Sequence, residues 1–176
     1  EDPDTVGRIQ EEVTINAIAP LTVTKHALPQ LLQSEEPTNL FVGSGVAFVP
    51  VVGTPVYSGT KSFLHQAAKA LRHQLNPLGV SVFEGPPPVV ATDMGNILAS
   101  DTLKVMIPED LVAQVWNELR KNRFEMVLGQ SKMLRIMSRL APEFIFREMA
   151  KVTCHAPAPH SFVGETDQAD MQDEKR

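Results

Sequence analysis

The 176 residues, of which 43% are hydrophobic and 21% charged, are enough to bury the core of one globular domain. A net charge of −5 offers no basic surface for nucleic acid, so we expect no such partner. No apolar run is as long as the about twenty residues that a membrane-spanning helix needs. The acidic start Glu1-Asp-Pro-Asp is unlike a signal peptide.

The first long helical pattern runs from about Thr5 to Gln33. Its apolar residues occupy more than one face, so we expect a helix buried on two sides. Asn16 is a polar residue within this stretch, and the pattern alone is compatible with a side chain that points to solvent or bonds the preceding turn. Pro20 should kink the helix, because it removes a backbone donor and crowds the preceding turn.

A β-like run from Asn39 to Gly43 is predicted to place Ser44 at the end of a strand. A loop rich in glycine and proline then leads to Pro55, a favourable residue for the first turn of a helix. Apolar residues at helical spacing continue to Leu75, where Asn76-Pro-Leu-Gly79 is a stop signal. We therefore expect a helix from about Pro55 to Leu75.

The only tyrosine, Tyr57, lies one helical turn before Lys61 on the same face of this helix. A nearby positive charge favours the phenolate and would lower the pKa of the tyrosine from about 10 toward neutrality, which makes it a usable general acid or base. Ser44 can bond the same substrate oxygen, so the three residues predict proton transfer to or from an alcohol or carbonyl oxygen. The Tyr–Lys pair by itself is common and often reports only a partly buried ring beside a solvated charge.

A second strand is predicted from Val80 to Glu84. Strand, helix and strand in close succession predict a right-handed βαβ unit with a parallel sheet. The segment from Gly85 to Met94 contains three consecutive prolines and cannot be regular structure. It follows the carboxyl end of a parallel strand, where open α/β sheets bind ligands.

The remaining part of the chain alternates helix and strand signals. Pro108 opens a helix from Glu109 to Lys121, whose acidic first turn suits the helix dipole. A short last strand is predicted from Phe124 to Leu128, and a helix interrupted at Pro142 from Lys132 to Lys151. The bases and bulky apolar residues of that last helix are compatible with a membrane surface, but packing against the domain or a second subunit is the interpretation that we favour.

The charged stretch from Gly164 to Arg176 lacks aromatic residues and is expected to be disordered. A single cysteine, Cys154, excludes an internal disulfide and indicates a reducing, cytoplasmic compartment. His155 and His160 lie near it, but the Ala-Pro-Ala-Pro between them and the lack of further ligands predict a loop and no metal site.

The serine thirteen positions before the tyrosine, the strand–loop–helix context and the Tyr-x-x-x-Lys spacing resemble the active-site segment of the classical short-chain dehydrogenase/reductase family. The likeness extends to Thr14-Ile-Asn-Ala-Ile-Ala-Pro20 and to the proline loop, where Pro87 and Thr92 match the family and Pro88 replaces its usual glycine. This double proline resembles a subgroup often labelled DltE-like.

The resemblance implies an α/β fold, namely part of a Rossmann-like, doubly wound parallel sheet of about three strands with flanking helices. That domain would span residues 1–152, with a disordered tail over 153–176. Gly95 to Ile107 would be a substrate-covering lid.

The resemblance also implies an oxidoreductase that transfers hydride between NAD or NADP and an alcohol or ketone, as a homodimer formed through the long helices. It assigns a proton relay to four catalytic residues, which are Asn16, Ser44, Tyr57 and Lys61. It assigns contact with the nicotinamide end of the cofactor to Tyr57, Lys61, Pro87, Pro88, Val90 and Thr92.

The likeness covers only the carboxyl-terminal part of a full family member. No Gly-x-x-x-Gly-x-Gly turn precedes a helix in the 176 residues, and no acidic residue follows one at ribose-binding distance. The 176 residues therefore lack most of the groups that bind the cofactor's pyrophosphate and adenosine. Two hypotheses stay open: an oxidoreductase, and a catalytically silent protein whose long helices form an interaction surface.

Overall fold

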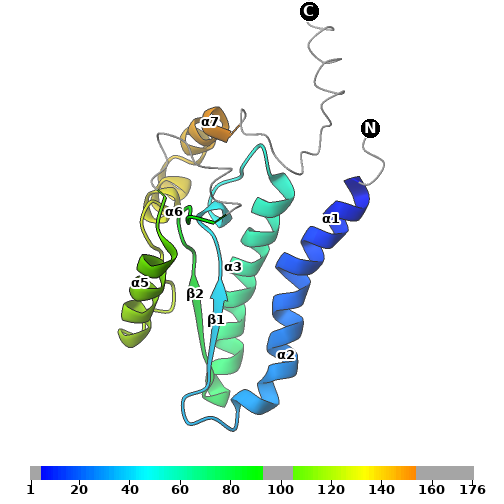
Figure 1. The fold of residues 1–176 in the computed structure, drawn as a ribbon, viewed down its shortest axis with the longest axis vertical. Coiled ribbons are helices and arrows are strands. Elements are labelled where there is room, and N and C mark those ends of the chain that lie inside the picture. The colour runs from blue at the N-terminus through cyan, green and yellow to red at the C-terminus, as the bar shows by residue number, and fades with distance from the viewer. Residues whose placement is uncertain (1–4, 93–104, 154–176) are drawn as a thin grey trace, which may run out of the picture.

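The computed structural model describes residues 5–92 and 105–153, and Figure 1 gives their arrangement. The elements are, in order, α1 (Thr5–Val13), the π-helical turn η1 (Thr14–Ile18), α2 (Ala19–Leu31), β1 (Thr38–Val42), the 3₁₀ turn η2 (Gly45–Ala47), α3 (Pro55–Leu75), the 3₁₀ turn η3 (Asn76–Leu78), β2 (Ser81–Gly85), α5 (Pro108–Arg120), α6 (Ser131–Leu140) and α7 (Pro142–Thr153). The predicted lid and tail and the Cys154 region lie wholly or mostly outside the described residues.

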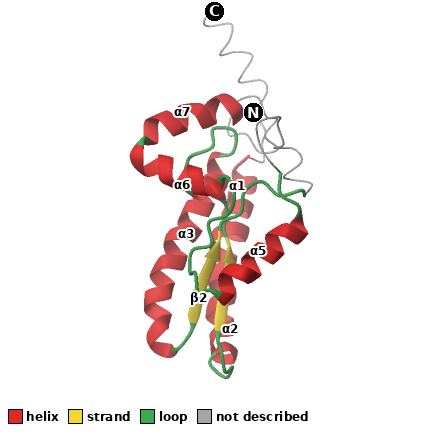
Figure 2. Ribbon diagram, turned by 90° about the vertical axis from the view of Figure 1, so that its left-hand side faces the viewer, coloured by secondary structure: helices red, strands yellow, loops and turns green. Residues whose placement is uncertain are grey.

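The sheet within the described residues consists of the two parallel strands β1 and β2, joined through α3 as the predicted βαβ unit. Their register runs from the pair Thr38 and Ser81 to the pair Val42 and Gly85. Figure 2 shows α3 and α5 on either side of the strands, which is the doubly wound arrangement. The α/β fold class is thus confirmed.

The expectation of a third strand from Phe124 to Leu128 is wrong. This segment runs along β2 but forms one isolated parallel bridge, in which the Glu84 N–H donates to the Phe124 carbonyl and the Met126 N–H donates to the Glu84 carbonyl. The next N–H that would extend that ladder would come from the residue after β2, but this residue is Pro86, which has none. The proline that marks the ligand-side loop therefore also stops the sheet.

The core lies between the sheet and α3. It consists of Phe41, Leu64, Ala68, Leu75, Val80 and Val82. The apolar face of α3 follows the spacing predicted from the sequence, and three partly buried leucines of α2 and α3 close the side of this cluster, namely Leu21, Leu28 and Leu71. The core holds α3 firmly against the strands, and this fixes the position of the residues in its first turns.

The first helical stretch differs from the expectation in its burial. Among its described residues only Ala17 and Thr24 are buried, while a row of apolar side chains is exposed, namely Val6, Ile15, Ile18 and Val23. The stretch packs against α3 and β1 with one side only. The prediction of burial on two sides is therefore wrong for this chain.

The predicted distortion near Pro20 takes the form of the π-helical turn η1, in which the Ala19 N–H donates to the Thr14 carbonyl. In a regular α-helix the carbonyl of Asn16 would accept from residue 20, but proline has no N–H to donate. A change of helical register at this point is the consequence. Such single π-turns are frequent at functional sites.

The later helices agree with the sequence. The predicted break at Pro142 separates α6 from α7, and α5 begins at Pro108. Across residues 5–92 and 105–153, no helix is both long and apolar enough to traverse a bilayer. The same residues hold no group of three or more potential metal ligands.

Candidate active site

Ser44 and the proline loop lie side by side at the carboxyl ends of the two strands. The Gly43 N–H donates to the Gly85 carbonyl over 3.1 Å, and the Gly45 N–H donates to the Pro87 carbonyl over 3.1 Å. Figure 1 shows both strands running toward this end of the molecule, where η2 follows β1. Backbone hydrogen bonds thus hold Ser44 against the segment that follows β2.

Tyr57 lies in the first turn of α3, close enough to Ser44 for that side chain to lower the pKa of its phenol. The Ser44 hydroxyl also accepts from the Val46 N–H over 3.4 Å and caps η2. The predicted proximity of the phenol and the serine hydroxyl is therefore present in the structure. Both side chains are half-buried, so an oxygen of a bound molecule can reach them.

Lys61 follows one turn later on α3. Its Nζ atom lies 5.5 Å from the centroid of the Tyr57 ring and donates to the Val42 carbonyl over 3.4 Å. The ammonium therefore sits beside the face of the ring, at the end of β1. Burial lowers the pKa of Lys61, and the carboxylate of Glu84 opposes that effect by raising it.

The direction of the Tyr57 shift differs from the sequence-based expectation. Burial is the largest cause and raises the pKa of the phenol above its ordinary value; the Ser44 hydrogen bond lowers it, and the charge of Glu12 raises it. Burial raises this pKa because it penalises the charged phenolate. At neutral pH the phenol accordingly keeps its proton.

Asn16 is half-buried in η1, which packs against α3. Within the described residues its side chain makes no hydrogen bond with Tyr57 or Lys61. The structure thus brings three of the four predicted catalytic residues close together, and Asn16 lies on a neighbouring element that packs against α3. Its assigned role stays a prediction.

The predicted cofactor-contact residues of the proline loop fall into two groups. Pro87 is bonded to the Ser44 segment, as described above. Pro88 packs close to Gly129: a Cβ atom added to Gly129 would lie 3.1 Å from the Cγ atom of Pro88. Val90 forms an isolated bridge with Met106, and Thr92 is exposed beyond it. Of these residues, Pro87 therefore lies nearest to the Ser44–Tyr57 pair.

Three charged or titratable neighbours of the site were missed by the sequence analysis: Glu12, His65 and Glu84. The first two had a detectable signal, because Glu12 lies four residues before Asn16 and His65 four residues after Lys61 on the same helical faces. Glu84 had no detectable signal in the sequence, because its proximity to Lys61 depends on how β2 packs against α3.

Two cavities in the described part of the molecule have other linings. One, of about 750 Å³, lies between α5 and α6. The smaller, about 330 Å³, lies beside the start of α3, where Val51, Ser58 and Phe146 contribute. Neither contains Ser44, Tyr57 or Lys61.

Comparison with known proteins identifies close sequence relatives. A family model described as short chain dehydrogenase matches residues 4–102. The uncharacterized oxidoreductase DltE of Bacillus subtilis (strain 168) is 31% identical over 143 residues, which are 79% of this chain and 56% of that protein. Serine 3-dehydrogenase of Rhizobium radiobacter is 36% identical over 100 residues, covering 53% of this chain and 40% of that protein.

Solved structures agree with the fold. A short chain dehydrogenase from Burkholderia cenocepacia J2315, in complex with NADP, superposes with a TM-score of 0.74 at 18% identity, covering 85% of this chain and 60% of that one. A short-chain dehydrogenase from Sphingobium yanoikuyae, in complex with NADPH, gives 0.59 at 24% identity, covering 77% and 53%. The 176 residues thus span little more than half the length of such proteins.

Proposed function

The chain belongs to the short-chain dehydrogenase family, and on that premise we propose that it carries the catalytic residues of an oxidoreductase which transfers hydride between NAD or NADP and an alcohol or ketone. The observation that carries this proposal is the position of the Tyr57 phenol, which has Ser44 among its neighbours and the ammonium of Lys61 beside its ring. These groups converge where two parallel strands end, the place at which open α/β sheets bind ligands.

In the proposed reaction Tyr57 donates a proton to the carbonyl oxygen during reduction, or removes one from the alcohol during oxidation. Ser44 orients that oxygen through its hydroxyl. Lys61 stabilises the phenolate that remains after proton donation. Asn16, on the π-turn behind them, completes a relay that returns a proton to the site. The nicotinamide supplies or accepts the hydride.

The protonation state of Tyr57 suits the acid role in reduction. Burial raises its pKa, so the phenol keeps its proton at neutral pH and can act as the general acid that reduction of a ketone requires. Oxidation of an alcohol needs the phenolate as base.

The residues present fit the nicotinamide–ribose end of the cofactor. Lys61 has three donors, and its described hydrogen bond to the Val42 carbonyl, long at 3.4 Å, uses one of them. Donors thus stay available for ribose hydroxyls, with Pro87, Pro88, Val90 and Thr92 along the adjoining loop. The 176 residues hold no Gly-x-x-x-Gly-x-Gly turn for the pyrophosphate, so the fit is to one end of the cofactor only.

The exposed apolar row on α1, η1 and α2 supports a homodimer. Val6, Ile15, Ile18 and Val23 lie along one continuous helical stretch and are each more than half exposed. Burial of such a row against its copy would remove apolar area from water. The single cysteine favours a reducing compartment, and we propose the cytoplasm.

Cofactor titration of the 176-residue chain tests the proposal. We expect micromolar binding of NADH or NADPH, observed as a change in cofactor fluorescence, and its loss in Lys61→Ala. Phe63→Ala, on an exposed part of the same helix, is the control and should bind normally. A dimeric chain that binds neither cofactor would instead support the catalytically silent interaction protein.

A further inference from the structure

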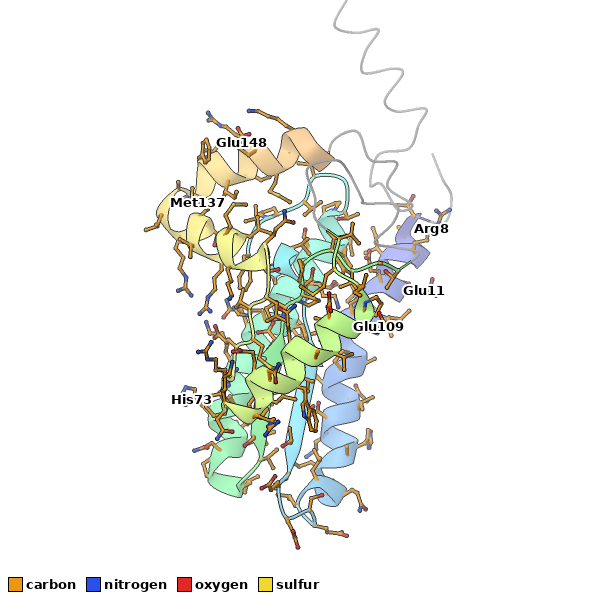
Figure 3. The ribbon with its side chains drawn as sticks, turned by 60° about the vertical axis from the view of Figure 1, so that its left-hand side comes forward. Arg8, Glu11, His73, Glu109, Met137 and Glu148 are labelled. Atoms are coloured by element: carbon orange, nitrogen blue, oxygen red, sulfur yellow. The ribbon has the colours of Figure 1, made fainter. Side chains whose placement is uncertain are left out.

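A buried pair of titratable side chains lies directly behind Lys61. The Nδ1 atom of His65 is 2.6 Å from the Oε2 atom of Glu84, and the two residues are 5% and 0% exposed. His65 lies one turn beyond Lys61 on α3, so Tyr57, Lys61 and His65 share one helical face. Figure 3 shows the other histidine of this helix, His73, near its far end and away from the site.

Glu84 approaches the same stretch of backbone as Lys61, from a different element. A Cβ added to Gly43 would lie 2.6 Å from the Oε1 atom of Glu84, and Lys61 bonds the carbonyl of Val42, the preceding residue. The carboxylate comes from β2 and the ammonium from α3. Both therefore converge on the end of β1, immediately before Ser44.

The second oxygen of this carboxylate lacks a hydrogen-bond partner among the described residues. Oε1 of Glu84 is fully buried, and only Oε2 contacts His65. Burying a carboxylate oxygen without a donor is costly unless an opposite charge compensates it. The ammonium of Lys61, which donates to the carbonyl of the residue before Gly43, is the positive charge on which Glu84 acts.

Other charged groups near the pair are engaged elsewhere. Glu125, which bridges to the backbone of Glu84, is surrounded by Lys69, Arg72 and Arg135. Glu12 of α1 acts on Tyr57. The remaining face of His65 meets the ring of Phe48 edge-on, with 5.1 Å between ring centroids. The charge that opposes the burial of Lys61 thus comes from Glu84.

Stabilising the packing of α3 against β2 would not need a charged pair at this place, since a well-packed apolar pair of similar volume stabilises such packing as well or better. A charge is useful here because Lys61 must stay protonated to stabilise the Tyr57 phenolate. We propose that Glu84 is a positioning residue for the reaction: its buried carboxylate, oriented by His65, holds Lys61 in its protonated form beside Tyr57. The benefit of this arrangement for catalysis rests on the proposed function. The effect of Glu84 on the protonation of Lys61 can be measured without any turnover.

The test is a direct titration of Lys61 by NMR of the lysine side chains, with its signal assigned from Lys61→Met. Burial lowers the Lys61 pKa and Glu84 opposes this, so Glu84→Gln removes the opposing charge while it keeps the size and a hydrogen bond to His65. We expect the pKa of Lys61 to shift further downward in Glu84→Gln. An unchanged titration would overturn the inference.

A matched control separates this effect from a general loss of packing. Thr24→Val removes another partly buried side-chain hydrogen bond between a helix and a strand, from Asn39 Nδ2 to Thr24 Oγ1 at 2.9 Å. It should lower stability without moving the Lys61 titration. A shift in this variant equal to that in Glu84→Gln would mean that any loosening of the fold acts on Lys61, and the inference would fail.

A second variant keeps the inference falsifiable if Glu84→Gln does not fold. Glu84→Asp retains the charge but withdraws it by one methylene, so the Lys61 pKa should fall below that of the unmodified chain. Identical titrations in Glu84→Asp and the unmodified chain would overturn the inference. The titration does not need turnover. If the Lys61 pKa changes with Glu84 as expected but the protein is inactive, only the proposed function is refuted.

Discussion

Tyr57 is the single residue on which the proposed chemistry depends, and Phe is its closest replacement because only the hydroxyl is lost. We predict that Tyr57→Phe, in the protein that contains these residues, lowers turnover by about 100- to 10,000-fold and leaves cofactor affinity nearly unchanged. Steady-state kinetics together with a cofactor titration measure the two effects. A variant that keeps most of its turnover would refute the role of the phenol.

Because Tyr57 is the only tyrosine, its ionisation can be followed by the near-ultraviolet absorbance of the phenolate without interference from another phenol. Burial and Glu12 raise its pKa and outweigh the Ser44 hydrogen bond. We predict that the phenolate appears at a higher pH in the folded chain than in the unfolded chain, and at a lower pH in Glu12→Gln than in the unmodified chain. Ionisation of the folded chain below that of the unfolded one would contradict this.

At the scale of the elements, α3 is the part that carries the site, and its packing decides where Tyr57 and Lys61 lie. Leu64 is 2% exposed in the core against the sheet, whereas its neighbour Phe63 is 49% exposed. We predict that Leu64→Ala lowers the free energy of unfolding by about 2–5 kcal/mol, and that Phe63→Ala changes it by no more than about 0.5 kcal/mol. Chemical denaturation followed by circular dichroism compares the two, and equal losses would show that α3 does not pack as described.

The π-turn η1 is the second element with a consequence for the site. Pro20→Ala restores an N–H that the Asn16 carbonyl can accept, so the helix can return to the α register and rotate Asn16 relative to α3. We predict that Pro20→Ala is at least as stable as the unmodified protein but has a lower turnover rate. Thermal unfolding and kinetics test this, and unchanged turnover in a regularised helix would remove Asn16 from the relay.

At the scale of the whole molecule, the exposed apolar residues of α1, η1 and α2 form the surface that we propose for the homodimer. We predict that Val23→Glu, at a position 65% exposed, shifts the chain from dimer toward monomer. Val112→Glu on α5, at a position 67% exposed, is the matched control and should leave the assembly unchanged. Sedimentation velocity distinguishes the two, and equal behaviour would exclude this row as the dimer surface.

The sequence by itself determined the features that depend on neighbours along the chain. Helical spacing placed Tyr57 and Lys61 on one face of α3, the stop at Asn76 led into β2, and the strand–helix–strand order predicted the parallel pair. Those features were predictable because a regular helix or strand fixes the relative positions of its own residues. The same local pattern around Ser44, Tyr57 and Lys61 was sufficient to indicate the family.

Only the tertiary structure decided the features that depend on groups distant in the chain. The segment from Phe124 to Leu128 forms one bridge and no strand, next to Pro86, which cannot extend the ladder. The first helix buries one side only, because nothing described covers the other. The pKa of Tyr57 rises, contrary to expectation, because packing removes water and brings Glu12 near, while β2 brings Glu84 behind Lys61. Burial and long-range charge are set by how elements pack, and spacing along a single helix does not contain them.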